Sequence, residues 1–227
     1  MATFLDQVNA LTSLEISGST TDPSQNELSE FLRDGVKDVV NRIIALKPQE
    51  ASKFSKTTES ATNNTAYTGK ILSVVREHDS ETILRRCTPI SSNLRYLATD
   101  EDSIHYRSKS NPGYYILQGV VCTVPAPGGS SNSYIVDQVH YDVGLAYGDN
   151  YNATTSTIAN FPIEYEYLVA IYAAIKSLES KMANFAIDEE DTELVQAISA
   201  NLNSLKQEYA SAFASMASPQ PQQAGGR

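Results

Sequence analysis

The sequence predicts an α+β fold, in which a helical bundle made of an N-terminal helix and a C-terminal helical hairpin carries an inserted small antiparallel β-sheet. Apolar residues recur at helical spacing in residues 28–44 and again in 162–216. Between these stretches, from Lys70 onward, apolar residues form short runs bounded by turn residues, as strands do. We therefore expect a helical bundle from 1–50 and 160–217, a β-rich insert at 51–159 and a flexible C-terminal tail at 218–227.

Two helices are expected before the insert. The first is short and carries Phe4, Leu5, Val8 and Leu11. After a linker rich in Ser, Thr and Gly, either Asp22 or Ser24 can cap the second helix, with Glu27 in its first turn. Its broad apolar face ends at Lys47-Pro48, because the residue before a proline disfavours helical geometry.

The insert is expected to begin with a loop at 51–69, which is rich in Ser, Thr and Asn and has room for one short helical turn. Short strands should follow at 71–77, 82–87, 114–117, 120–124 and 134–141, with a short helix at 90–100. The turn-forming run Pro125 to Asn132 predicts that the last two strands pair as a β-hairpin with an extended loop.

Residues 162–216 predict two antiparallel helices joined by the acidic turn Asp188–Asp191. Pro162 suits the first helical turn, where its missing N–H is not needed. In each helix, large apolar residues at steps of three and four should share one face. These residues are Ile163, Tyr167, Ile171, Ile175, Leu178, Met182 and Phe185 in the first helix, and Leu194, Ile198, Leu202, Leu205, Tyr209, Phe213 and Met216 in the second.

The charge distribution argues against binding to polyanions. The chain has 17 basic and 27 acidic residues, net −10. Residues 162–217 hold nine acids and three bases, residues 1–50 eight and four, and residues 51–161 ten and nine. Acidic surfaces repel polyanions, so we expect no sequence-specific nucleic-acid binding. The N-terminus lacks a signal-peptide pattern and no apolar run is long enough for a membrane span, so we expect synthesis in a cytosol and no membrane partner.

The sequence offers no catalytic or metal-binding constellation. Cys87 and Cys122 are isolated and are expected to be free thiols, and the three histidines are far apart in sequence. The runs Asp188–Asp191 and Asp100–Asp102 read as a helix cap and a solvated turn, since neither has the spacing of a calcium loop. No phosphate loop or nucleophile motif is present. We therefore expect a non-enzymatic protein without cofactor or metal.

The first helix of the hairpin has small residues beside its apolar stripe, with Tyr165, Tyr167 and Tyr172 around it. A helix that is apolar on more than one side needs a second surface to bury against. Two surfaces remain open at this point. One is the chain's own β-sheet, and the other is an adjacent copy of the chain in a ring.

Several stretches resemble virion structural proteins of tailed phages, notably marine and cyanobacterial ones. They are Phe161–Glu179, Glu190–Ile198, residues 28–44 and Val124–Pro127. The plan of a helical bundle with a β insert and a pendant tail is similar to that of head-to-tail adaptor (neck) proteins. The resemblance covers most of the chain, and none of its motifs carries a mechanism.

The resemblance implies a homo-oligomeric ring, commonly a dodecamer, that docks under the portal protein in the virion neck. Such a ring continues the DNA channel without binding DNA specifically, offers a platform to the tail tube, nozzle or other neck proteins, and performs no catalysis. It also implies that the C-terminal tail inserts between portal subunits. On this basis we expect a subunit or portal interface at Tyr165, Tyr167, Ala170, Ala173, Ala174, Tyr209, Phe213 and Arg227, and a tail-side contact at Pro125, Pro127, Gly128 and Gly129.

Two alternatives to a connector remain. A tail-tube or tail-completion protein of the virion would be dominated by β-sandwich or barrel structure, so a helix content near half of the chain would argue against it. An enzyme acting on a small molecule would need a concave polar site, and an activity lost on changing His105 or Cys122 would favour it.

Overall fold

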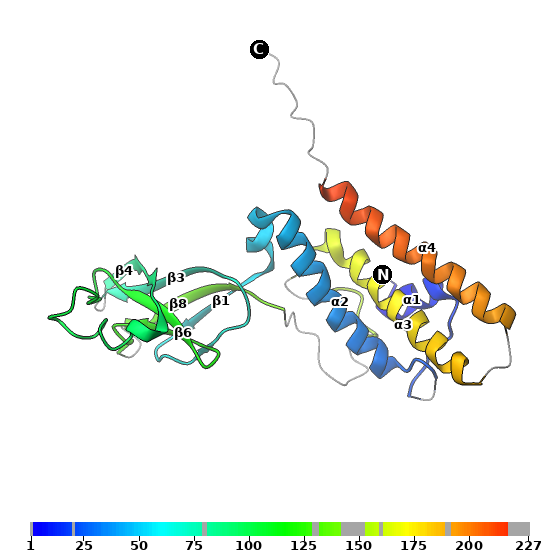
Figure 1. The fold of residues 1–227 in the computed structure, drawn as a ribbon, viewed down its shortest axis with the longest axis horizontal. Coiled ribbons are helices and arrows are strands. Elements are labelled where there is room, and N and C mark those ends of the chain that lie inside the picture. Colours follow the sequence, from blue (N-terminus) through cyan, green and yellow to red (C-terminus); the bar gives the residue numbers. More distant parts are fainter. Residues whose placement is uncertain are drawn as a thin grey trace, which may run out of the picture. The chain divides into compact units, whose positions relative to one another are not determined.

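The computed structural model describes residues 2–19, 21–78, 81–128, 132–141, 153–158, 161–188 and 192–217. It confirms the predicted α+β class, with 48% helix and two small four-stranded sheets (Figure 1). The chain divides into two compact units. Unit 1 comprises Met1–Lys53 and Asp142–Arg227, and unit 2 comprises Phe54–Tyr141. Within the described chain, no helix is both long and apolar enough to cross a membrane.

Unit 1 is helical, and its first helices begin where the sequence places capping signals. Its elements are α1 (Phe4–Thr12), α2 (Gln25–Leu46), most of the 3-10 helix η1 (Pro48–Phe54), the 3-10 helix η4 (Ile163–Tyr165), α3 (Glu166–Asp188) and α4 (Thr192–Ala217). Ser24, rather than Asp22, is the N-cap of α2, and it forms a capping box with Glu27. Thr3 and Asp6 form the same motif at α1. Each box satisfies backbone N–H groups that a helix N-terminus leaves unpaired.

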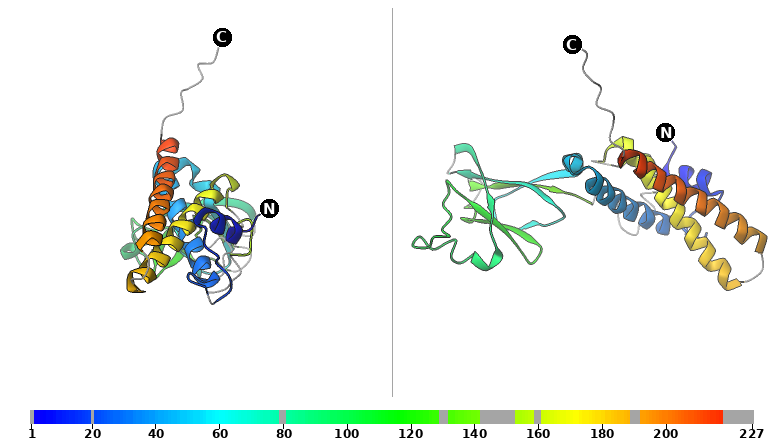
Figure 2. Two further views of the ribbon diagram at one scale, coloured as in Figure 1. Left: turned by 90° about the vertical axis from the view of Figure 1, so that its right-hand side faces the viewer. Right: turned by 45° about the horizontal axis from the view of Figure 1, so that its top comes forward.

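Helix α3 is the centre of unit 1 because α1, α2 and α4 all pack against it (Figures 1 and 2). Close packing of α2 depends on Gly35, since a Cβ there would lie 3.1 Å from Tyr172 Cδ1 and 3.3 Å from the carbonyl oxygen of Val169. The buried residues of α3 extend over more than one face of the helix. They are Leu168, Val169, Ala170, Ile171, Ala173, Ala174, Ile175, Ser177 and Leu178.

The predicted stripe of large apolar residues along one face of α3 is wrong at its start and confirmed in its middle. Ile163 and Tyr167 are 76% and 46% exposed, while Tyr165 is buried. Ile163–Tyr165 forms a 3-10 turn, which has about three residues per turn, so its side chains do not continue the angular spacing of α3. On α4, the predicted stripe is buried from Ile198 to Phe213, and only Leu194 at its beginning is exposed.

A polar and aromatic cluster fixes the C-terminal half of α4 to α2. The Tyr209 hydroxyl donates a hydrogen bond to Asp38 Oδ2 at 2.6 Å, and Arg42 Nε donates to the same oxygen at 2.7 Å. The Arg42 guanidinium also lies 5.3 Å from the Tyr209 ring centre and 5.5 Å from that of Phe213. Burial of the phenol and its bond to the Asp38 carboxylate raise the pKa of Tyr209, so the hydroxyl stays protonated and keeps its donor role.

A second cluster joins η1 to η4 within unit 1. The Tyr165 hydroxyl donates to Glu50 Oε2 at 2.5 Å, and Lys53 Nζ lies 3.4 Å from the same oxygen and 3.1 Å from Glu164 Oε1. The hydrogen bond from Tyr165, assisted by the Lys53 ammonium, lowers the pKa of Glu50. Burial and the adjacent carboxylate raise the pKa of Tyr165 to about 12. The cluster therefore holds the residues that lead into the insert.

Unit 2 consists of two sheets that share one apolar core. Sheet A has the order β1-β8-β3-β4 and sheet B the order β2-β7-β6-β5. Side chains from both sheets, including Val74, Val121, Val136 and Cys87, form the core, and the Tyr134 hydroxyl donates to the Val121 carbonyl at 2.9 Å. The strands are β1 (Ser55–Ser60), β2 (Thr65–Ala66), β3 (Ile71–His78), β4 (Glu81–Arg86), β5 (Thr88–Pro89), β6 (Gly113–Leu117), β7 (Val120–Val124) and β8 (Tyr134–Val139).

The structure corrects three predictions for the insert. Residues 51–69, expected as a loop with room for one short helical turn, contain the end of η1, which agrees with that turn, but they also contain strands β1 and β2. The predicted hairpin of 120–124 with 134–141 does not form, because β7 belongs to sheet B while β8 pairs with β1 and β3 in sheet A. Residues 90–100 contain only the 3-10 turn Ser92–Leu94 (η2).

The C-terminal side of the insert ends earlier than the predicted residue 159. Unit 2 stops at Tyr141, and residues from Asp142 onward belong to unit 1. Two backbone hydrogen bonds explain part of this boundary, from Phe4 N to Thr155 O and from Leu5 N to Ala153 O, both 2.8 Å. They attach the segment at 153–155 to the first turn of α1.

The Tyr165–Glu50 contact predicts a defined pH dependence of stability. The lowered pKa of Glu50 means that its contribution is present above the ordinary carboxyl pKa and is lost as pH falls through the lowered value. The substitution Tyr165→Phe should lower the free energy of unfolding by about 1–2 kcal/mol at pH 7, and this difference should shrink at pH 3. Urea denaturation at both pH values measures it.

The matched control is Tyr106→Phe, which removes an exposed Tyr-to-Glu hydrogen bond of 3.3 Å to Glu101. We expect this control to change the free energy of unfolding by less than about 0.5 kcal/mol, because a solvent-exposed pair contributes little. An equal effect of the two variants at pH 7 would contradict the role of the Tyr165–Glu50 contact.

Candidate functional site

The structure buries most of the residues expected at a subunit or portal interface. Ala170, Ala173 and Ala174 are at most 1% exposed, and Tyr165, Tyr209 and Phe213 at most 7%. These side chains contact neighbouring helices of their own chain, so they are not free to form a surface for a partner, and that assignment is wrong for them. Of the described residues in the set, only Tyr167 is exposed, and Arg227 lies outside the described residues.

The expected tail-side contact lies in the connection between β7 and β8. Pro125 and Pro127 are half-buried and Gly128 is exposed, while Gly129 lies outside the described residues. The connection is attached to sheet A by Arg76, whose side chain is 2% exposed. Its guanidinium donates to the carbonyl of Pro125 at 3.0 Å and to that of Ala126 at 3.1 Å. This anchoring fixes the start of the connection, where both prolines are half-buried.

A larger exposed apolar surface lies on residues 92–107 of unit 2, here called the apolar loop. Its side chains with the greatest exposure are Ile104 at 95% and Tyr96 at 71%, and Leu97 and Tyr106 are also exposed. Sequence reasoning missed this loop because its apolar residues have neither helical nor strand periodicity. An aromatic and aliphatic cluster within a short non-periodic segment was the available signal.

The apolar loop has a defined backbone despite its exposed side chains. The Arg107 N–H donates to the Ala98 carbonyl at 2.9 Å, and Ala98 itself is buried. The Arg95 guanidinium lies 4.3 Å from the Tyr96 ring centre and donates to its hydroxyl at 3.1 Å. A pre-ordered loop loses less conformational entropy on binding, so such a surface is suited to docking against another protein.

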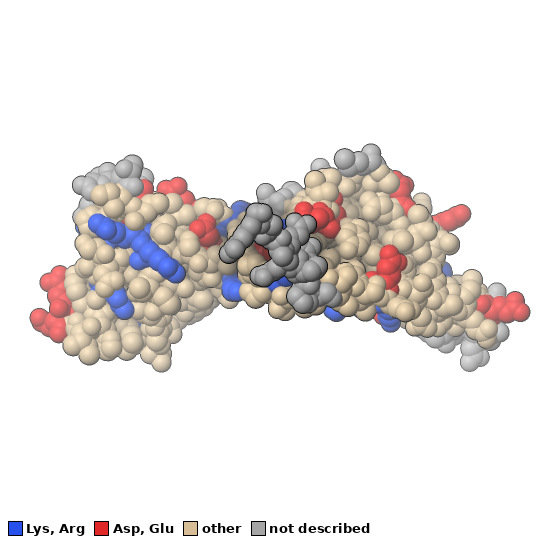
Figure 3. Space-filling model, turned by 90° about the horizontal axis from the view of Figure 1, so that it is seen from above, with Lys and Arg blue, Asp and Glu red and all other residues tan. Residues whose placement is uncertain are grey.

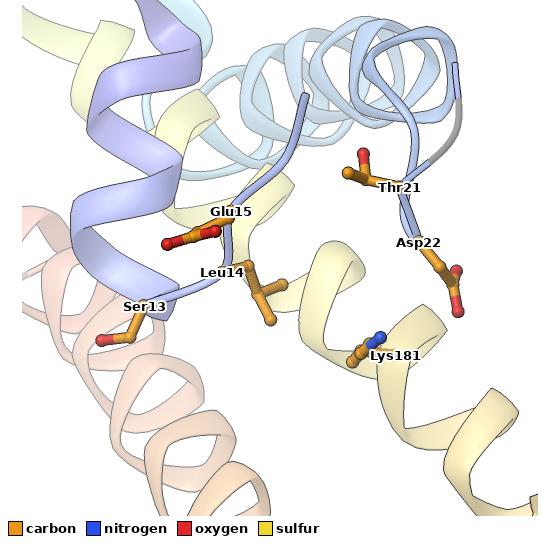
Figure 4. Close-up of a pocket in the computed structure, with 6 residues that line it drawn as sticks. All are labelled: Ser13, Leu14, Glu15, Thr21, Asp22 and Lys181. Atoms are coloured by element: carbon orange, nitrogen blue, oxygen red, sulfur yellow. The ribbon is translucent and has the colours of Figure 1, made fainter. Parts of the chain in front are cut away.

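Unit 1 contains a hollow of about 470 Å³ beside the segment that joins α1 to α2 (Figure 4). Its charged lining residues are Glu15, Asp22 and Lys181. Asp22 accepts a hydrogen bond from Asn184, and the Lys181 ammonium lies 4.7 Å from the Phe185 ring centre. Figure 4 shows Leu14 between Glu15 and Lys181, so the charged groups do not converge on one point. This arrangement does not position an acid, a base and a substrate together.

The thiols are poor nucleophiles. Burial raises the pKa of Cys87 to about 12, and it also raises the pKa of the half-buried Cys122. Both side chains therefore remain protonated at neutral pH, while the thiolate is the reactive form. Among the residues that the structure describes, no three His, Cys, Asp or Glu side chains gather as metal ligands.

Charge differs between the two units. Unit 1 contains 19 acidic and nine basic residues, whereas unit 2 contains eight of each. Figure 3 shows acidic side chains over the surface of unit 1, and both acidic and basic side chains on the visible face of unit 2. The excess negative charge of the protein thus resides in the helical unit.

Comparison of the chain with protein-family models and with curated proteins gave no match in either case.

The burial of the α3 alanines predicts that a charge placed there disrupts the fold of a single chain. Ala174→Glu should lower the free energy of unfolding by more than about 3 kcal/mol, because a carboxylate would lose its hydration without gaining a partner. Thermal unfolding at dilute protein concentration measures the effect. Ala210→Glu, on the exposed side of α4, is the control and should cost less than about 1 kcal/mol. A soluble, fully stable Ala174→Glu chain would show that the other helices of unit 1 do not bury this face of α3.

Proposed function

We propose that this protein is a structural head-to-tail connector of a tailed phage, which joins the portal to the tail in the virion neck. The observation that carries the proposal is the apolar loop, which exposes Ile104 and Tyr96 from an ordered backbone. Exposed apolar clusters of this kind mark surfaces for protein partners. The resemblance of Phe161–Glu179 and the other stretches to phage neck proteins supplies the kind of assembly.

The proposal assigns the apolar loop to the contact with the tail tube, nozzle or another neck protein. Tyr and large aliphatic residues are favoured in the centre of protein interfaces because they bury much surface. Four such side chains lie in the loop, whereas the predicted contact at Pro125, Pro127 and Gly128 offers less apolar area. The β7–β8 connection would then lie outside the centre of this contact.

The charge of unit 1 is consistent with a channel through which DNA passes. Its excess of ten negative charges would repel the phosphate backbone, so DNA would slide without adhering. In the connector proposal, the chain forms a ring, commonly of twelve copies, and binds no specific DNA sequence. The C-terminal tail with Arg227 would insert between portal subunits, and it lies outside the described residues.

A tail-tube or tail-completion protein is the second candidate. The two sheets of unit 2 share a core, and this arrangement is the feature that favours such a protein. The helix content of 48% favours the connector, because tail-tube proteins are built mainly of strands. An enzymatic role has less support, since the charged groups at the hollow do not converge and the thiols are protonated.

The connector proposal predicts tailless particles when the apolar loop is made polar. The double substitution Tyr96→Ser and Ile104→Ser should leave the free energy of unfolding nearly unchanged, because both side chains are exposed. Phage particles assembled with this variant should contain DNA-filled heads, of which at least about tenfold fewer carry tails, as expected for an interface that loses about 1.4 kcal/mol or more. Negative-stain electron microscopy counts the two classes.

The control is Ile163→Ser, which removes an isoleucine that is 76% exposed on unit 1. We expect its particles to keep their tails. Two results would contradict the proposal: full tailing of particles that carry the double variant, or absence of the wild-type chain from purified virions by mass spectrometry.

A further inference from the structure

The fully exposed charges of the apolar loop are acidic. Asp100, Glu101 and Asp102 are consecutive in the loop, and all three side chains are exposed. Within the described chain, none of these three carboxylates forms an ion pair. Their negative charge is therefore available to a partner of opposite charge.

The two basic residues of the loop are half-buried and are held by the loop and the sheet beneath it. The Arg95 guanidinium donates to the Ser92 carbonyl at 3.0 Å and to the Tyr96 hydroxyl at 3.1 Å. The stem of Arg107 packs against β6, since a Cβ at Gly113 would lie 3.3 Å from Arg107 Cγ. Both cations thus have a role in the fold of the loop itself, whereas the three carboxylates extend from it into solvent.

The carboxylates share one short segment with the exposed apolar side chains. A backbone hydrogen bond closes this segment at its two ends, residues 98 and 107. Inside it, the Tyr106 hydroxyl donates to Glu101 Oε1 at 3.3 Å, and Ile104, which is 95% exposed, follows Asp102 by two residues. A partner that covers Ile104 and Tyr106 will therefore also lie close to the acidic groups.

This charge selects among the surfaces that could cover the loop. The loop of a second copy would bring like charges together, and unit 1 of a second copy carries an excess of ten negative charges. DNA and anionic lipid would be repelled in the same way. A protein surface with lysine or arginine around an apolar centre has neither disadvantage, and an apolar centre with a polar rim is the usual form of a protein interface.

We infer that the apolar loop binds a protein surface on which an apolar patch is bordered by lysine or arginine, with Asp100, Glu101 and Asp102 facing these cations. The inference rests on the proposed connector function, and it gives the chemistry of the tail-side partner at this site. The apolar side chains supply the buried area of the contact, and the carboxylates accelerate its formation and restrict the choice of partner.

Removal of the three charges without change of shape tests the inference. The triple variant Asp100→Asn, Glu101→Gln and Asp102→Asn keeps the oxygen that accepts from the Asp102 N–H at 3.1 Å and the oxygen that accepts from Tyr106. Because these local hydrogen bonds remain, the midpoint of thermal unfolding should stay within about 2 °C of the wild-type value.

The matched control removes three exposed acids from unit 1. It combines Asp34→Asn, Glu193→Gln and Glu208→Gln, so its net charge changes by the same amount as in the loop variant. A difference between the two variants reports the position of the charges and not the total charge of the chain.

The measurement is the rate at which DNA-filled heads that carry each chain join purified tails of the same phage, with joined particles counted by negative-stain electron microscopy. At about 50 mM salt, we expect the loop variant to join about tenfold more slowly than the wild type and the control to join at the wild-type rate. At about 500 mM salt, the wild-type rate should fall and the loop variant should come within about twofold of it, because salt screens exposed charges.

The outcomes separate the inference from the function on which it rests. Joining of the loop variant at the wild-type rate or faster at low salt would overturn the basic partner and leave the connector function intact. A wild-type rate that does not fall with salt would do the same. If heads carrying the wild-type chain failed to join tails at either salt concentration, the connector function itself would fail, and the partner inferred from it would fail too.

Discussion

Burial of α3 within its own unit is the constraint on which the rest of the bundle depends. Helices α1, α2 and α4 pack around it. Gly35 allows α2 to approach Val169 and Tyr172, and the alanines of α3 occupy the interior without bulk. Larger residues such as Leu168 and Leu178 fill the remaining space, and each would cost about 2–5 kcal/mol if truncated to alanine. The polar contacts of Tyr209 and Tyr165 then fix α4 and the entry to the insert.

This packing limits the surfaces that are available for assembly. An interior helix cannot also be the wall between two subunits, because its apolar side chains already contact their own chain. The exposed apolar residues with large area are found mainly in unit 2, on the apolar loop and on β4. We therefore assign a stabilising role to the helical unit and the binding roles to the β unit. In the connector proposal, the negative charge of unit 1 would have a separate purpose, which is to keep DNA from adhering.

The sequence was most informative where the determining interactions are local. The cap at Ser24, the stop at Lys47-Pro48 and the α4 stripe from Ile198 to Phe213 all depend on neighbours within a few residues of the chain. Strand β1 was missed because its six residues are polar, and it is a strand only because β8 lies beside it. The β7–β8 hairpin was predicted wrongly because the turn residues between two strands do not specify which sheet each strand joins.

The candidate site was less predictable for a related reason. The small residues Ala170, Ala173 and Ala174 indicate a close approach by another helix, but the sequence does not specify whether that helix belongs to the same chain. Their burial within unit 1 decides the question. The apolar loop has no periodicity, and its exposure depends on the way Arg107 pairs with Ala98 to fold the segment back. Both features arise from tertiary structure, which a local pattern does not encode.

Amide hydrogen exchange, compared between the free chain and the chain assembled with portal and tail proteins, distinguishes a buried α3 from an α3 that forms the subunit interface. We expect residues 168–178 of α3 to exchange slowly in the free chain and to change little on assembly, because their helix is already buried. New protection should appear in residues 92–107 of unit 2. Rapid exchange of α3 in the free chain, with protection gained only on assembly, would contradict the burial of α3 within its own unit and return the subunit interface to the helical hairpin.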